Sequence, residues 1–191
     1  MEDIYVGDAG KGFPLVLVHG FLGSSQMWKP QIEYFKKNYR VITPDLPGFG
    51  KSNKFSSSNS IITMAKIIID CLKKKGINKF HLLGHSMGGM IAQEILKIAE
   101  NQIFKLICYG TGPIGEVPGR FESMDESREK LKKIGLEKTA HRIAKTWFVK
   151  EESSKYFYLC SNAGKETSLE AADNALIAMK NWNGLDNLKN I

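Results

Sequence analysis

One serine in this sequence has the neighbours that nucleophilic chemistry requires. Residues 84–88 read Gly-His-Ser-Met-Gly, so Ser86 has a glycine two positions away on each side. The motif follows the apolar run Phe80–Leu83 and precedes a helical pattern from Gly89 to about Ala99. A serine on such a strand-to-helix turn is exposed, and the glycines let strand and helix approach without a Cβ clash. We predict that Ser86 is a nucleophile that attacks a carbonyl carbon; the alternative is a tight glycine-rich turn.

The oxygen that becomes negative in such an attack needs hydrogen-bond donors nearby. The start of the helix after Ser86 offers unpaired N–H groups and the positive end of its dipole. A second donor is expected in the loop after an earlier strand, and residues 19–25, His-Gly-Phe-Leu-Gly-Ser-Ser, follow the run Leu15–Val18. We therefore predict an oxyanion hole made by the backbone N–H groups of Phe21 and Met87. The alternative for residues 19–25 is an ordinary loop.

The elements that must position these groups form an alternating pattern. Short continuous apolar runs, which suit strands buried on both faces of a parallel sheet, occur at Leu15–Val18, Tyr39–Ile42, Phe80–Leu83 and Phe104–Cys108. Helical periodicity lies between them, at 61–72 and 92–99. This order predicts an α/β fold with a mostly parallel sheet flanked by helices, and a functional site at the carboxyl ends of the strands.

The character of the sequence changes after Cys108. Glycines and prolines interrupt residues 110–119, and helical patterns without intervening strands then cover 125–134, 136–149, 151–163 and 169–182. We interpret this region as a helical cap inserted over the sheet. The predicted division is residues 1–111 for the first part of the core, 112–183 for the cap and 184–191 for the start of the return to the core.

Composition limits the classes of partner. The chain has 191 residues, 42% hydrophobic and 25% charged, with a net charge of +7. Its lysines are dispersed, which favours solvated faces over nucleic acid or an anionic membrane. The three cysteines are widely spaced, so a disulfide framework or a zinc site is not expected. The N-terminus does not resemble a signal peptide, and no apolar run approaches the roughly 18 residues of a membrane span. We expect a soluble cytoplasmic protein that binds a small-molecule substrate, and a homo-oligomer stays possible.

Three segments together carry a family resemblance. These are residues 19–25 with Trp28, residues 44–52 (Pro-Asp-Leu-Pro-Gly-Phe-Gly-Lys-Ser) and residues 84–89. They resemble the α/β-hydrolase superfamily, and in particular enol-lactonases and meta-cleavage-product hydrolases. The resemblance implies a serine hydrolase acting on a small ester, a lactone or a C–C bond next to a carbonyl group. It also implies a histidine base oriented by an acid, and neither a metal nor an organic cofactor. The alternative is a non-catalytic binding or scaffold protein on the same fold.

The sequence departs from the family pattern where the base and acid should be. In the family they follow the cap, in the order serine, acid, histidine, whereas this sequence reaches Ile191 directly after the last cap pattern. We therefore expect the natural polypeptide to continue, or another chain to cover the open edge at Phe104–Cys108. No base or acid is assigned within the chain. His85 is expected to point away from Ser86, and His81, His141 and Asp45 have structural interpretations.

A few residues are candidates for contact with a substrate. His19 is placed in the oxyanion loop, where a structural hydrogen bond is the alternative role. Trp147 and Phe148 could line an apolar pocket between cap and sheet, although an aromatic pair on a helix more commonly serves packing. Arg120 could meet a substrate carboxylate, with a loop salt bridge as its alternative.

Overall fold

A five-stranded sheet forms the centre of the molecule. The computed structural model describes residues 3–119 and 122–190. Along the sheet the order of strands is β1-β3-β2-β4-β5, and β1 pairs antiparallel with β3 while every other pairing is parallel. The predicted α/β fold with a mostly parallel sheet is confirmed. The bounds of the strands are β1 Val6–Ala9, β2 Phe13–Val18, β3 Tyr39–Pro44, β4 Phe80–His85 and β5 Ile103–Tyr109.

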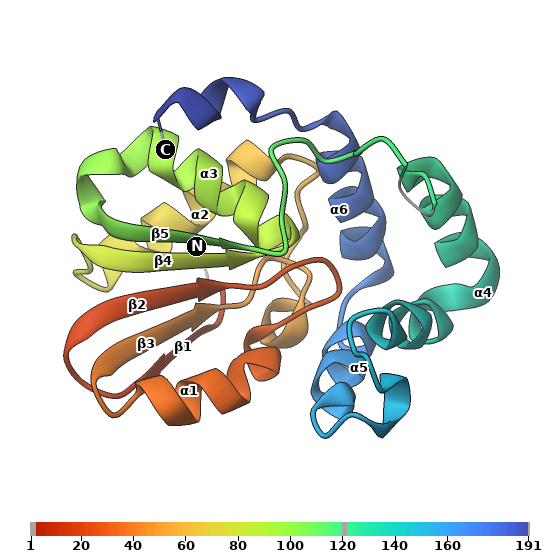
Figure 1. The fold of residues 1–191 in the computed structure, drawn as a ribbon, viewed down its shortest axis with the longest axis horizontal. Helices are drawn as coiled ribbons and strands as arrows, with labels where there is room; N and C mark the ends of the chain where they lie inside the picture. The colour runs from red at the N-terminus through yellow and green to blue at the C-terminus, as the bar shows by residue number, and fades with distance from the viewer. Residues whose placement is uncertain (1–2, 120–121, 191) are drawn as a thin grey trace.

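Helices cover the two faces of the sheet unequally (Figure 1). The helices α2 (Ile61–Lys74) and α3 (Met87–Ala99) pack on one face, where Val16, Ile42 and Leu82 belong to the main core. On the other face, α1 (Lys29–Phe35) packs near a smaller cluster that contains Leu15, Leu17 and Val41. Successive strand residues point to opposite faces, so a continuous apolar run supplies both clusters.

Three helices gather beyond the carboxyl ends of the strands (Figure 1). They are α4 (Met124–Lys145), α5 (Phe157–Lys165) and α6 (Leu169–Asn181). Gly135 interrupts α4 with φ 80° and ψ 169°, at the residue that separates two of the predicted helical patterns. The third pattern was placed too early, because a 3-10 turn at Glu151–Ser153 precedes α5. Among the described residues, no helix is long and apolar enough to cross a membrane.

The segments that lead into and out of these helices lie side by side. Ile114 and Asn183 form an antiparallel bridge, the Gly184 N–H donates to the Pro113 carbonyl over 2.7 Å, and the Gly115 N–H donates to that of Trp182 over 3.2 Å. The helical region therefore leaves the core and returns to it at one place. The amide of Ser168, before α6, also donates to the Gly48 carbonyl of the core over 2.8 Å. The function of this region as a cap remains a prediction.

A buried carboxylate holds the start of α4 to its second half. The Glu122 side chain is 2% exposed, and it accepts hydrogen bonds from the Ser127 hydroxyl, the Lys130 ammonium and the Arg142 guanidinium. Burial alone would raise the pKa of Glu122, but these three donors lower it to about 2 from an ordinary value near 4.5. The ionised form is thus the one that the folded state stabilises.

We expect this cluster to make the fold acid-sensitive. Because the pKa of Glu122 is lower in the folded state, its stabilisation is complete above pH 4.5 and is lost as the pH falls towards 2. The shift corresponds to roughly 3 kcal/mol. Glu122→Gln should lower the free energy of unfolding at pH 7 and flatten its fall between pH 4.5 and 2, as measured by urea unfolding followed by circular dichroism. The exposed Glu129→Gln is the control. Parallel pH profiles for all three proteins would contradict the assignment.

Candidate functional site

Ser86 lies at a strained turn between a strand and a helix. The strand β4 ends at His85 and α3 begins at Met87, which leaves Ser86 between them with φ 53° and ψ −120°. A non-glycine residue rarely adopts such a backbone, at a cost of about 1–3 kcal/mol. Backbone hydrogen bonds hold it: its N–H donates to the Tyr109 carbonyl over 2.9 Å, and its carbonyl accepts from the Gly89 N–H over 2.8 Å and from the Met90 N–H over 3.4 Å.

The glycines around Ser86 are needed because backbones meet closely here. A Cβ atom on Gly84 would lie 2.2 Å from the Gly88 carbonyl oxygen, and one on Gly88 would lie 2.3 Å from the Val18 carbonyl oxygen. Both distances are too short for any side chain. The glycine spacing seen in the sequence therefore lets α3 begin directly against the ends of β4 and β2.

The loop after β2 lies against this turn. A Cβ atom on Gly20 would lie 3.0 Å from the Ser86 Cβ and 2.8 Å from the His85 carbonyl oxygen. Leu22 has φ 53°, and the Gly23 N–H donates to the Gly20 carbonyl over 3.0 Å, so the loop curls back on itself. Within the described residues, the backbone N–H groups of Phe21 and Met87 donate to no other residue. Two unbonded donors thus occur in the two segments that flank Ser86.

The His19 side chain holds this loop in place by hydrogen bonds. Its ring is fully buried; Nδ1 bonds to the Gly20 carbonyl over 2.9 Å, and Nε2 accepts from the Leu46 N–H over 3.1 Å. These partners assign the neutral form with the proton on Nδ1, and burial lowers the pKa of His19. Neither nitrogen is left over for a substrate. The geometry favours the structural role that the sequence allowed for His19, and its contact with a substrate stays a prediction.

Asp45 acts on the same loop from the neighbouring strand. Its carboxylate is buried and accepts from the Ser25 N–H over 2.5 Å and from the Lys51 N–H over 2.9 Å. It therefore closes the turn after β3 and ties it to residues 19–25. This matches the turn role inferred from the sequence.

His85 is enclosed by aromatic rings. Its ring centroid lies 5.5 Å from Tyr109, 5.9 Å from Trp147 and 6.4 Å from Trp28. Burial, and to a smaller extent His19, lower the pKa of His85, and its buried Nδ1 has no partner among the described residues. The sequence did not single out Tyr109. The pairing of the strands identifies this residue, because Tyr109 of β5 pairs directly with His85 of β4.

None of the histidines acts on Ser86 as a base in this structure. All four histidines lie in the described part, and none is hydrogen-bonded to the Ser86 hydroxyl. His81 lies at the far end of β4 beside Phe13 and Phe104, and His141 of α4 pairs with Glu152 of the 3-10 turn Glu151–Ser153 over 2.7 Å. These positions agree with the structural interpretations drawn from the sequence.

The remaining candidates fall elsewhere. Phe148 packs on Phe157 with a centroid distance of 6.0 Å, as an ordinary packing residue would. Arg120 lies outside the described residues.

No group of His, Cys, Asp and Glu side chains in the described part could hold a metal ion. A groove of about 780 Å³ lies away from Ser86, and it is lined by residues 3–4, the 47–56 loop and one side of α2.

Comparison with known proteins identifies the family of this chain. A family model described as alpha/beta hydrolase fold matches residues 14–136. The chain belongs to the α/β-hydrolase fold family. This confirms the superfamily resemblance that the three sequence segments indicated.

Individual relatives of this hydrolase-fold chain carry hydrolase names. It is 30% identical over 150 residues to an (E)-2-((N-methylformamido)methylene)succinate hydrolase of Acinetobacter baylyi, covering 78% of this chain and 55% of that protein. It is 39% identical over 93 residues to a pimeloyl-(acyl-carrier protein) methyl ester esterase of Legionella pneumophila, covering 49% of this chain and 36% of that protein. The chain thus spans about half, or less, of the length of these curated relatives.

A solved structure shows the same arrangement of elements. An esterase from Exiguobacterium antarcticum superposes with a TM-score of 0.89 at 27% sequence identity, covering 98% of this chain and 73% of that one. Nearly every element of the α/β-hydrolase chain, the helices α4 to α6 included, therefore has a counterpart in that esterase.

Proposed function

We propose that this chain carries the nucleophile and the oxyanion-binding half of a serine hydrolase. The observation that supports it is the meeting of Ser86, in strained backbone, with two unbonded N–H groups of Phe21 and Met87. In this mechanism the Ser86 oxygen attacks a carbonyl carbon, and the N–H groups stabilise the negative oxygen that forms. The positive end of the α3 dipole acts in the same direction.

The substrate class that we propose is a small ester, a lactone or a C–C bond next to a carbonyl group. The names of the relatives support hydrolysis in general, since one acts on a substituted succinate and another on a methyl ester. Complete catalysis also needs a base and an acid, which we do not assign to any residue of this chain.

The proposal is tested by phosphonylation of the serine. A fluorophosphonate probe at alkaline pH loses fluoride when a serine oxygen attacks phosphorus, and the adduct is located by peptide mass spectrometry. We expect one adduct, on Ser86, and none in Ser86→Ala. The exposed Ser56→Ala variant should be labelled like the parent chain. A binding protein on the same fold predicts no selective adduct, and that result would refute the proposal.

A further inference from the structure

The rings around His85 come from three separate parts of the chain. Trp28 belongs to the 3-10 turn η1 (Ser25–Trp28), Tyr109 ends β5, and Trp147 follows α4. Trp28 and Trp147 stand nearly perpendicular to the His85 ring, at 89° and 84°, while Tyr109 is tilted by 36°. Trp28 is buried, whereas Tyr109 is 63% exposed and Trp147 is half-buried. Trp28 is therefore shielded from solvent, whereas Tyr109 and Trp147 are accessible to it.

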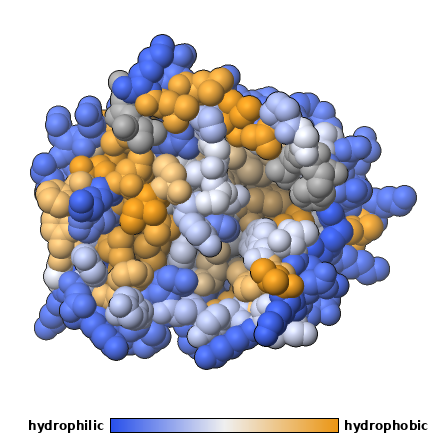
Figure 2. All heavy atoms as spheres, in the orientation of Figure 1, coloured by the Kyte–Doolittle hydropathy of each residue, from blue (hydrophilic) through white to orange (hydrophobic). Residues whose placement is uncertain are grey.

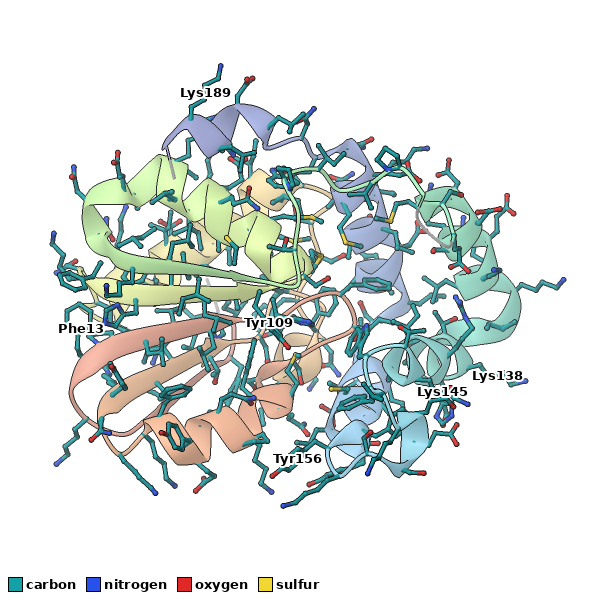
Figure 3. All side chains as sticks on the ribbon, in the orientation of Figure 1. Phe13, Tyr109, Lys138, Lys145, Tyr156 and Lys189 are labelled. Atoms are coloured by element: carbon teal, nitrogen blue, oxygen red, sulfur yellow. The ribbon has the colours of Figure 1, made fainter. Side chains whose placement is uncertain are left out.

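This group of rings lies directly beside Ser86. A Cβ atom on Gly20 would be 3.0 Å from the Ser86 Cβ and 3.2 Å from the His85 Nδ1, so both side chains border the same glycine. Figure 3 shows Tyr109 near the middle of the molecule, where the core meets the helices α4 to α6. The surface is hollowed between these two parts in the same orientation (Figure 2). A substrate whose carbonyl carbon reaches Ser86 would thus extend along these rings.

We propose that the rings of His85, Tyr109 and Trp147 bind a flat, unsaturated group of the substrate, next to the carbonyl that Ser86 attacks. Trp147 is then the residue that determines specificity. This inference rests on the proposed function and names the substrate class of the same site.

Ring chemistry supports a flat and uncharged group. Aromatic faces and edges attract other flat π systems by about 0.5–1.5 kcal/mol per pair beyond the burial of area. Tyr109 and Trp147 carry no charge, and burial lowers the pKa of His85, so its ring is neutral at pH 7. A saturated ring of the same size would gain only the burial.

Phe148, which follows Trp147 in the chain, is an aromatic residue with a packing role. Phe148 contacts Phe157, and both belong to the helical region. Trp147 instead reaches across to His85 of the core, at the turn that holds Ser86. Phe148 therefore serves as the matched control for Trp147.

The test separates binding from reaction by using Ser86→Ala protein. Benzyl alcohol and cyclohexylmethanol, which have similar size but different shape, are titrated by ligand-observed NMR. Two ring pairs predict about tenfold tighter binding of benzyl alcohol. Trp147→Leu removes one of the two pairs and should lower the preference to about threefold. Trp147→Phe should keep most of it and Phe148→Leu should leave it unchanged; thermal unfolding checks that each variant folds.

Two outcomes would overturn the inference. One is equal binding of the two alcohols by the Ser86→Ala protein. The other is an unchanged preference in folded Trp147→Leu. Phosphonylation of Ser86 is measured independently, so a chain that is labelled but has no preference for flat groups would retain the proposed function and lose only this inference.

Discussion

The 191-residue chain is expected to hydrolyse 4-nitrophenyl acetate no more than about a thousandfold faster than water does. Nucleophile and base act as a unit in serine hydrolases, so an unassisted serine retains only the effects of oxyanion binding and positioning. No histidine of this chain is hydrogen-bonded to Ser86, and both nitrogens of His19 are engaged elsewhere. The shortfall against a complete enzyme should be about a millionfold in kcat.

The measurement compares the parent chain and Ser86→Ala, each without and with added imidazole, under initial-rate kinetics. The parent chain alone should give the slow rate, and Ser86→Ala should lower it further. Added imidazole should accelerate the parent chain in proportion to its free-base concentration, once the uncatalysed reaction of imidazole is subtracted, because it supplies the missing base. Ser86→Ala should show no such gain. Rapid turnover without imidazole that disappears in Ser86→Ala would mean that a base exists within the chain, and the assignment of all four histidines would be wrong.

The strands that could be predicted were those whose own residues carry the signal. Continuous apolar runs predicted β2 to β5. Four buried residues end each of β2 and β3, every second residue of β4 is buried, and β5 carries the apolar run although most of its residues are exposed. The strand β1 was not predicted, since Gly7 and Asp8 are poor strand formers. It exists because residues Val6 to Ala9 pair with Val41 to Pro44 of β3, which is a tertiary contact. The break of α4 was predictable because Gly135 adopts a positive φ that other residues avoid.

The residues of the candidate site likewise include some that the sequence could predict and some that it could not. Ser86 and its glycines could be predicted because the turn is contiguous in the sequence and its geometry demands small residues. The rings around His85 could not, because Trp28, Tyr109 and Trp147 are far apart in the chain and are residue types common in any core. The two engaged nitrogens of His19 likewise depend on Leu46, which only the fold brings near.

The unpaired edge of β5 is expected to have a large effect on whether the chain self-associates. β5 is last in the sheet, so one side of its backbone has no strand partner among the described residues. Phe104, Ile107 and Tyr109 are 68%, 47% and 63% exposed, and the strand contains one lysine and no proline. Figure 2 shows apolar residues gathered over the part of the sheet that α1 leaves uncovered. Natural edges are normally blunted by charge, bulges or cover, because bare edges pair with other strands.

We therefore expect the isolated chain to self-associate as its concentration rises. Size-exclusion chromatography with light scattering should show a mass that grows from the monomer value between micromolar and millimolar protein. Ile107→Lys adds a charge to the exposed edge strand and should shift the midpoint to at least tenfold higher concentration, since burying an unpaired ammonium costs more than 1.4 kcal/mol. Ile62→Lys, on the exposed side of α2 with similar exposure, is the control and should associate like the parent chain. A parent chain that stays monomeric at millimolar concentration would show that this edge, despite its apolar sequence, is not adhesive.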